Sequence, residues 1–132
     1  MEDNVSRVKQ DTLAFFDKRR ELYPLYESFE SKIIKEYPVS KIKVQKTQIT
    51  LSNRHIFACI SFMRPLKKSE LPSSYFVITL GLPYPLDSGR AAVKTEPYPG
   101  RWTTHIIISS QEELNDELYG WVRQAYEFAE NK

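Results

Sequence analysis

The stretch PYPGRWTTHIIISS, residues 97–110, decides the fold of the C-terminal half of the chain. It opens with Pro97, Pro99 and Gly100, which exclude both a helix and a central strand and indicate a turn. The β-branched residues that follow predict a strand up to Ile108. Ser110 then begins an S-x-x-E pattern, which is typical of a capping box at the start of a helix.

Alternation along this strand separates two faces. Trp102, Thr104, Ile106 and Ile108 share one side, and we expect Trp102, Ile106 and Ile108 to belong to the core. Arg101, Thr103, His105 and Ile107 share the other side, which carries a cation, a hydroxyl and an imidazole. This second side is the one available to solvent, a ligand or a partner.

The rest of the chain predicts two helices before the strands. The first runs to about Arg20, and the second follows Pro24 and ends before Pro38. Strands are expected at residues 39–45, 55–62 and 75–82, and residues 48–51 either continue the first strand or form a second short one. A loop is expected at 63–74. Residues 86–99 have no clear overall pattern, although 87–89 favour a turn and 90–94 either a short strand or one helical turn. Residues 110–129 give the most amphipathic helix. The predicted fold is α+β, with N-terminal helices, an antiparallel sheet of about five strands and a C-terminal amphipathic helix packed on one sheet face.

Length and composition predict one domain over residues 1–132. No apolar run approaches the roughly 20 residues that span a membrane, and the charged N-terminus lacks the apolar stretch of a secretory signal. Cys59 is the single cysteine and cannot form an internal disulfide. These observations favour a cytoplasmic protein.

Charge is distributed unevenly along the chain. From Lys32 to Lys68 there are nine lysines and arginines and one acid, Glu36, whereas the flanking thirds are net acidic. A solvated basic face and a surface for phosphate or nucleic acid both fit this pattern.

The predicted strand phase assigns the sheet residues to faces. The core face would bury Ile56, Ile60, Phe76, Ile78, Leu80, Trp102, Ile106 and Ile108. The opposite face mixes aromatic rings, cations, hydroxyls and an imidazole, a composition shared by ligand pockets and by faces that a loop or a second subunit covers. Its candidate ligand-binding residues are Lys46, Gln48, Phe57, Tyr75, Arg101, Thr103 and His105.

No enzymatic motif is recognisable in the sequence. The two histidines, His55 and His105, and the single Cys59 have no metal-ligand spacing, so neither a metal nor a cofactor is expected. A nucleophilic pair of Cys59 with either histidine would require that the side chains be adjacent in the fold.

Several motifs together resemble the bacterial DUF5655 family of domains of unknown function. They are KTQI at 46–49, FA at 57–58, GLP at 81–83, PGRWT at 99–103 with His105, and DEL at 116–118 with Trp121 and AY at 125–126. The resemblance covers about residues 25–129. It implies a small α+β domain, found alone or fused to other domains, some of them nuclease-like, and it implies no reaction or catalytic residues. Thr104 stands where members often have a second histidine.

The leading functional hypothesis is a non-enzymatic module that binds an anionic ligand, either a small molecule or single-stranded nucleic acid, on one sheet face. The alternative is a module for protein interaction or homodimerisation. A hydrolase is the third hypothesis.

Overall fold

The computed structural model describes the backbone of residues 2–132 and the side chains of residues 7–132. The helical elements are α1 (Glu2–Phe15), the 3-10 helix η1 (Asp17–Leu22), α2 (Tyr23–Glu36), the 3-10 turns η2 (Lys68–Glu70) and η3 (Gln111–Glu113), and α3 (Asp116–Glu130). The strands are β1 (Lys41–Val44), β2 (Gln48–Ser52), β3 (Ile56–Ser61), β4 (Phe76–Leu82), β5 (Ala91–Tyr98) and β6 (Arg101–Ile108). The predicted α+β class is confirmed.

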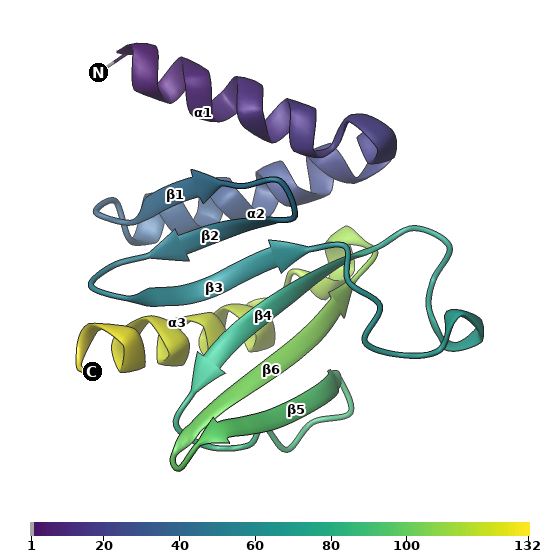
Figure 1. Ribbon diagram of the computed structural model, residues 1–132, viewed down its shortest axis with the longest axis vertical. Helices are drawn as coiled ribbons and strands as arrows, with labels where there is room; N and C mark the ends of the chain where they lie inside the picture. The colour runs from purple at the N-terminus through teal and green to yellow at the C-terminus, as the bar shows by residue number, and fades with distance from the viewer. Residues whose placement is uncertain (1) are drawn as a thin grey trace.

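The six strands form one antiparallel sheet in the order β1-β2-β3-β4-β6-β5. In Figure 1, α2 and α3 lie behind the sheet, and α1 lies beyond its β1 edge. No helix lies in front of the sheet in this view. We call this uncovered side the open face.

The core lies between the sheet and the helices α2 and α3. Central positions of β4 and β6, such as Ile78 and Ile106, are fully buried and are paired across the two strands. From α3, Leu118 and Val122 are also fully buried, as the amphipathic pattern of this helix predicts. Each such side chain contributes about 1.5–3 kcal/mol through removal of its apolar surface from water.

A β-bulge in β3 reverses two of the predicted face assignments. Leu51 pairs with Ala58, but the next residue of β2, Ser52, pairs with Ile56, so Phe57 is the extra residue. Phe57 is therefore buried and meets the Tyr126 ring of α3 edge-on, at 5.0 Å between ring centroids. Ile56 is 50% exposed. The predictions of Phe57 on the open face and Ile56 in the core are wrong.

Residues 86–99, which had no clear pattern in the sequence, contain a sixth strand. β5 is an edge strand, a position that tolerates Pro97 because proline has no backbone N–H and an edge strand has one side without a hydrogen-bonded neighbour. Pro99 and Gly100 turn the chain into β6, and Gly100 has φ +74°, the left-handed conformation that this turn requires. Trp102 lies on the core side but is only half-buried, since β6 begins at Arg101, at the rim of the sheet.

Two helix boundaries also differ from the prediction. α1 ends at Phe15 rather than near Arg20, and the chain continues as η1, in which the non-helical backbone angles of Arg19 (φ −143°, ψ 53°) form a kink before α2. The capping box of Ser110 and Glu113 stands at the start of the short turn η3 and not at the start of the long helix α3. Asn115 caps α3 instead, and its side chain accepts a hydrogen bond from the Leu118 N–H.

Candidate ligand-binding site

A row of small polar side chains crosses the middle of the open face. Cys59 pairs with Thr50 on one side and with Thr79 on the other, and Thr79 pairs with His105. Thr79 Oγ1 lies 2.8 Å from His105 Nδ1, within hydrogen-bonding distance. Burial lowers the pKa of His105, so its imidazole is neutral at physiological pH.

The row does not bring a thiol and an imidazole together. Thr79 separates Cys59 from His105, so their backbones are two strand spacings apart, roughly 10 Å. Burial also raises the pKa of the Cys59 thiol, which disfavours the reactive thiolate. Within the side chains that the structure describes, no group of three or more histidine, cysteine or acidic residues could hold a metal ion.

The other histidine has a structural role at the end of α3. His55 Nδ1 lies 2.9 Å from the carbonyl oxygen of Ala129, and the Asn53 side chain donates to the carbonyl oxygen of Tyr126 at 2.9 Å. Arg54 approaches the carbonyl oxygen of Glu130 at 3.4 Å. The β2–β3 turn therefore satisfies the last carbonyl groups of α3, where a cation is also favoured by the helix dipole.

The predicted site residues do not converge on one point of the open face. Thr103 and His105 lie on it in β6, whereas Arg101 lies at the β5–β6 turn. Lys46 lies in the β1–β2 turn, beside the end of the sheet where Gln48 pairs with Ser61. Ser61 pairs with Val77 of β4, and Val77 pairs with Ile107 of β6. Ile107 is six residues from Arg101 along β6, so Lys46 and Arg101 are at least about 20 Å apart.

Two of the predicted residues, Lys46 and Tyr75, lie at the end of the sheet opposite Arg101. They line two adjoining pockets of about 270 Å³ each, which share Lys18, Arg19 and Phe62. Lys46 lines one pocket and Tyr75 the other. We call this region, formed by η1, the β1–β2 turn, Phe62 and residues 73–75, the basic corner.

Aromatic stacking holds the basic corner in place. The guanidinium of Arg19 lies 4.3 Å from the centre of the Phe62 ring, and Phe15 stacks on the same ring at 4.9 Å between centroids. The Tyr75 hydroxyl donates to the Met63 carbonyl at 3.0 Å, and the Ser74 hydroxyl donates to Glu21 at 3.1 Å. These contacts tie η1 to the segment that precedes β4.

Two carboxylates also line the basic corner, Glu21 in one pocket and Asp17 in the other. Asp17, which lines one pocket, forms an ion pair with Arg20 at 3.0 Å. No described carboxylate lies within ion-pair distance of Lys18, Arg19 or Lys46. Sequence reasoning missed Lys18 and Arg19 because it placed them at the end of a regular helix, although the run KRR at 18–20 was a visible signal.

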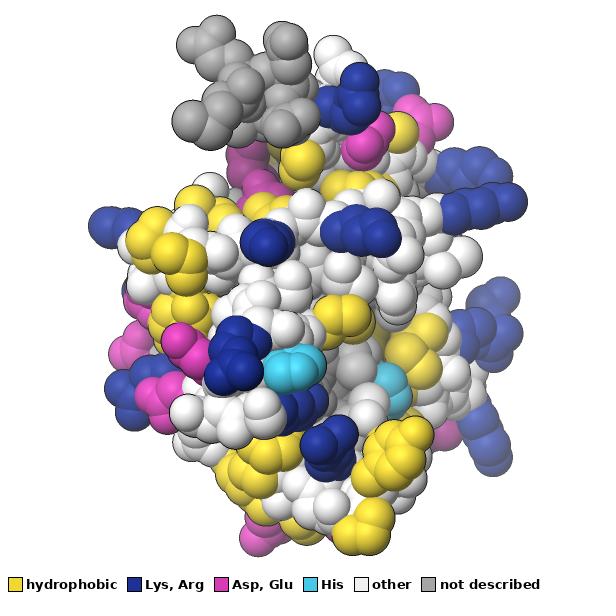
Figure 2. Space-filling model, turned by 60° about the vertical axis from the view of Figure 1, so that its left-hand side comes forward, with side chains coloured by type: hydrophobic (Ala, Val, Ile, Leu, Met, Phe, Trp, Pro, Cys, Tyr) yellow, Lys and Arg dark blue, Asp and Glu magenta, His cyan; other side chains and the backbone are white. Residues whose placement is uncertain are grey.

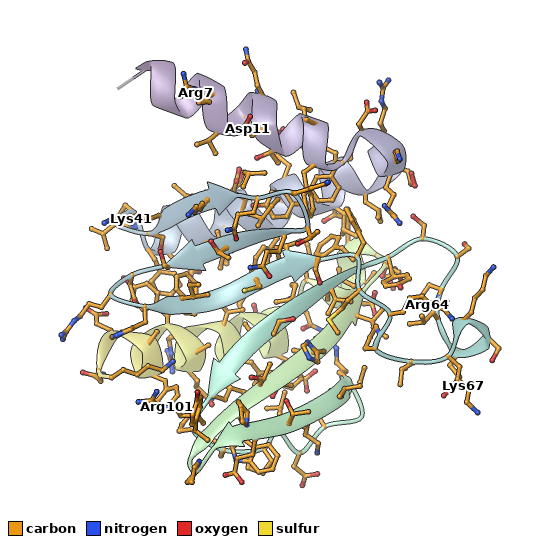
Figure 3. The ribbon with its side chains drawn as sticks, in the orientation of Figure 1. Arg7, Asp11, Lys41, Arg64, Lys67 and Arg101 are labelled. Atoms are coloured by element: carbon orange, nitrogen blue, oxygen red, sulfur yellow. The ribbon has the colours of Figure 1, made fainter. Side chains whose placement is uncertain are left out.

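The other cations of the basic middle third are spread around the molecule. In Figure 3, Lys41 lies at the start of β1, whereas Arg64 and Lys67 lie on the loop at the opposite end of the sheet. Figure 2 likewise shows separate lysine and arginine side chains with hydrophobic and neutral surface between them. The run of positive charge in the sequence therefore does not form one continuous track.

The fold is that of a small α+β domain in which no described helix covers one face of the antiparallel sheet. Residues 13–129 match the family described as Domain of unknown function (DUF5655), and the chain belongs to this family. The match begins at residue 13 rather than near 25 and so includes the end of α1 and all of η1. Comparison with curated proteins and with solved structures gives no match. No described helix has the length and apolar character required to cross a bilayer.

Proposed function

We propose that this domain is a non-enzymatic binding module that holds a small phosphate-bearing molecule at the basic corner. The observation that carries the proposal is the approach of Lys18, Arg19 and Lys46, from two separate segments, around pockets next to Phe62. Three cations that form no described ion pair, beside two carboxylates that are engaged by Arg20 and Ser74, favour an anion. The stacked aromatic rings favour a ligand with an apolar or planar part.

The size of the pockets favours a small molecule over a nucleic-acid strand. Each pocket has a volume of about 270 Å³, enough for a phosphate group or one ring. A strand would require a basic groove that follows its backbone over several nucleotides. Lys41 and Arg101 lie at the far end of the sheet in Figure 3, away from the loop that carries Arg64 and Lys67, so they do not extend the corner into such a groove.

The proposal keeps Lys46 and Tyr75 from the sequence prediction and adds Lys18 and Arg19. Gln48 lies two residues after Lys46 and does not line either pocket, and its side-chain amide donates to the Gln45 side chain at 3.2 Å. Arg101, Thr103 and His105 lie outside the corner, and their role in ligand binding stays a prediction. Phe57 is excluded by its burial against α3.

A titration with adenosine monophosphate and with a labelled oligothymidylate tests this proposal. The wild-type protein should bind the mononucleotide with an affinity that falls as salt rises, since cations neutralise the phosphate. Lys46→Ala and Lys18→Ala should each weaken binding about threefold to tenfold. Arg101→Ala, the matched loss of a cation at the other end of the sheet, should leave the affinity unchanged.

Three results would contradict it. The first is no saturable binding of the mononucleotide at low salt. The second is a loss of binding in Arg101→Ala with none in Lys46→Ala, which would transfer the site to the β5–β6 end. The third is binding of the oligonucleotide alone, with a salt dependence that indicates several phosphate contacts, which would replace the small ligand by a strand.

A further inference from the structure

A second, larger cavity lies between α1, α2 and the start of β1. This cleft has a volume of about 680 Å³, which falls within the range of small-molecule sites. Its walls are mainly apolar, with Val8 from α1, Ile34 from α2 and Ile42 from β1. It opens beside the start of β1, whereas the basic corner lies beyond the end of that strand. The two cavities are separate.

Two carboxylates of α2 also line the cleft. Glu27 and Glu30 are three residues apart, so both lie on the same side of the helix. The hydroxyl of Tyr23 donates to Glu27 Oε2 at 3.2 Å, and the hydroxyl of Tyr26 donates to Glu30 Oε1 at 3.1 Å. Each tyrosine fixes one oxygen of its carboxylate and leaves the other oxygen for a ligand.

Glu30 is the inner of the two carboxylates. It is half-buried, and its pKa is raised by burial first and by the charge of Glu27 second, while the Tyr26 hydroxyl acts in the opposite direction. Neither carboxylate forms an ion pair with a described lysine or arginine. Lys9 and Lys35 also line the cleft. Both lysines and Glu27 are exposed, so water screens their charges more than that of the half-buried Glu30.

An unpartnered hydroxyl lies in the same cavity. Ser40 Oγ is buried and has no hydrogen-bond partner among the described groups, whereas the Ser40 backbone N–H donates to Tyr37. Buried polar atoms are usually satisfied, so this hydroxyl is a contact point for a ligand or a water molecule. The cleft therefore combines an apolar wall, a hydroxyl and two carboxylates that form no described ion pair, with two exposed lysines at its border.

We propose that the cleft between α1, α2 and β1 binds an amphipathic organic cation, with its ammonium group at Glu27 and Glu30 and its apolar body along Ile34 and Ile42. An ammonium group donates three hydrogen bonds, and the carboxylates present two unused oxygens. The apolar body removes the exposed hydrocarbon of the walls from water. This ligand is opposite in charge to the one proposed for the basic corner, so the two proposals are independent.

Octylammonium and octanoate, used below their micellar concentrations, provide a direct test because they share an apolar chain and differ in charge. Calorimetric titration of the full chain should show 1:1 binding of octylammonium at least about tenfold tighter than that of octanoate. Glu30→Gln should remove most of this preference. The glutamine still offers an oxygen to the Tyr26 hydroxyl, so the variant should fold. Glu112→Gln, a matched change at an exposed acid of η3, should bind as the wild type does.

Other outcomes would overturn the proposal. Equal affinity for octanoate, or full affinity in Glu30→Gln, would reduce the cleft to a non-selective apolar surface. Dimerisation through this face, detected by sedimentation at the titration concentrations, would assign the cleft to a second copy of the chain. Amide chemical shifts that respond near Lys46 and not near Ile34 would place the cation elsewhere.

Discussion

At the scale of single residues, one extra residue in β3 decides which side chains face the helices. Strict alternation from Ile60 assigns Ile56 to the core and Phe57 to the open face. The bulge opposite Ser52 shifts the phase, so that the larger aromatic ring is buried against Tyr126. A bulge depends on how two strands pair, and the sequence of one strand does not reveal it.

Truncation at the two positions should therefore have unequal effects. Phe57→Ala should lower the free energy of unfolding by about 3–5 kcal/mol, because it leaves a cavity between β3 and α3. Ile56→Ala should cost less than about 1 kcal/mol, because the side chain is half-exposed. Urea denaturation of both variants measures the difference. Equal losses, or a larger loss at Ile56, would show that β3 keeps a regular alternation.

His105 should make stability depend on pH. Its pKa is lowered by burial from the ordinary value of 6.5. As the pH falls below 6.5, the unfolded chain binds a proton at this ring before the folded protein does. Stability should therefore be full above this value and should decrease until the pH passes below the folded-state pKa.

Urea denaturation from about pH 7.5 to about pH 5 should show this decrease in the wild type and a smaller one in His105→Asn. Asparagine keeps a polar group near Thr79 and does not titrate. An identical pH dependence in the two proteins would mean that the imidazole titrates equally in the folded and unfolded states.

At the scale of elements, Arg90 holds the connection between β4 and β5 against the N-terminal end of α3. Its guanidinium donates to the Asn115 side chain at 3.0 Å, to Glu117 at 3.1 Å and to the Glu113 carbonyl at 2.6 Å. It also lies over the Trp121 ring, at 5.5 Å from its centre. One arginine thus ties the residue before β5 to the N-terminal end of α3, a contact that connects distant parts of the sequence.

Arg90→Ala should lower the free energy of unfolding by about 1–3 kcal/mol, because three acceptors near the helix start lose their donor. Amide hydrogen exchange should accelerate at residues 86–90 and in the first turn of α3. Arg64→Ala, an exposed arginine of the loop after β3, is the matched control and should change neither quantity. Unchanged exchange in Arg90→Ala would show that the connection is held by Leu86 and the strand pairing alone.

At the scale of the whole molecule, local patterns predict the elements and long-range contacts decide the site. Period-two alternation predicted β6, the apolar run at 75–82 predicted β4, and the amphipathic pattern predicted α3, because each pattern reflects burial along one segment. The edge strand β5 has almost no buried face, so its sequence carries no such alternation. The basic corner was only partly predictable, since Lys18 and Arg19 meet Lys46 through the turn at η1, which interrupts an otherwise helical pattern.

We propose that the domain binds its anionic ligand at the basic corner and not at the β5–β6 end of the open face. Amide chemical-shift mapping during a titration with adenosine monophosphate tests it most directly. Saturable shifts should be concentrated at residues 18–19, 46–47 and 73–75, with little change at Arg101, Thr103 and His105. Shifts centred on those three β6 residues, or no saturable shifts at low salt, would contradict it.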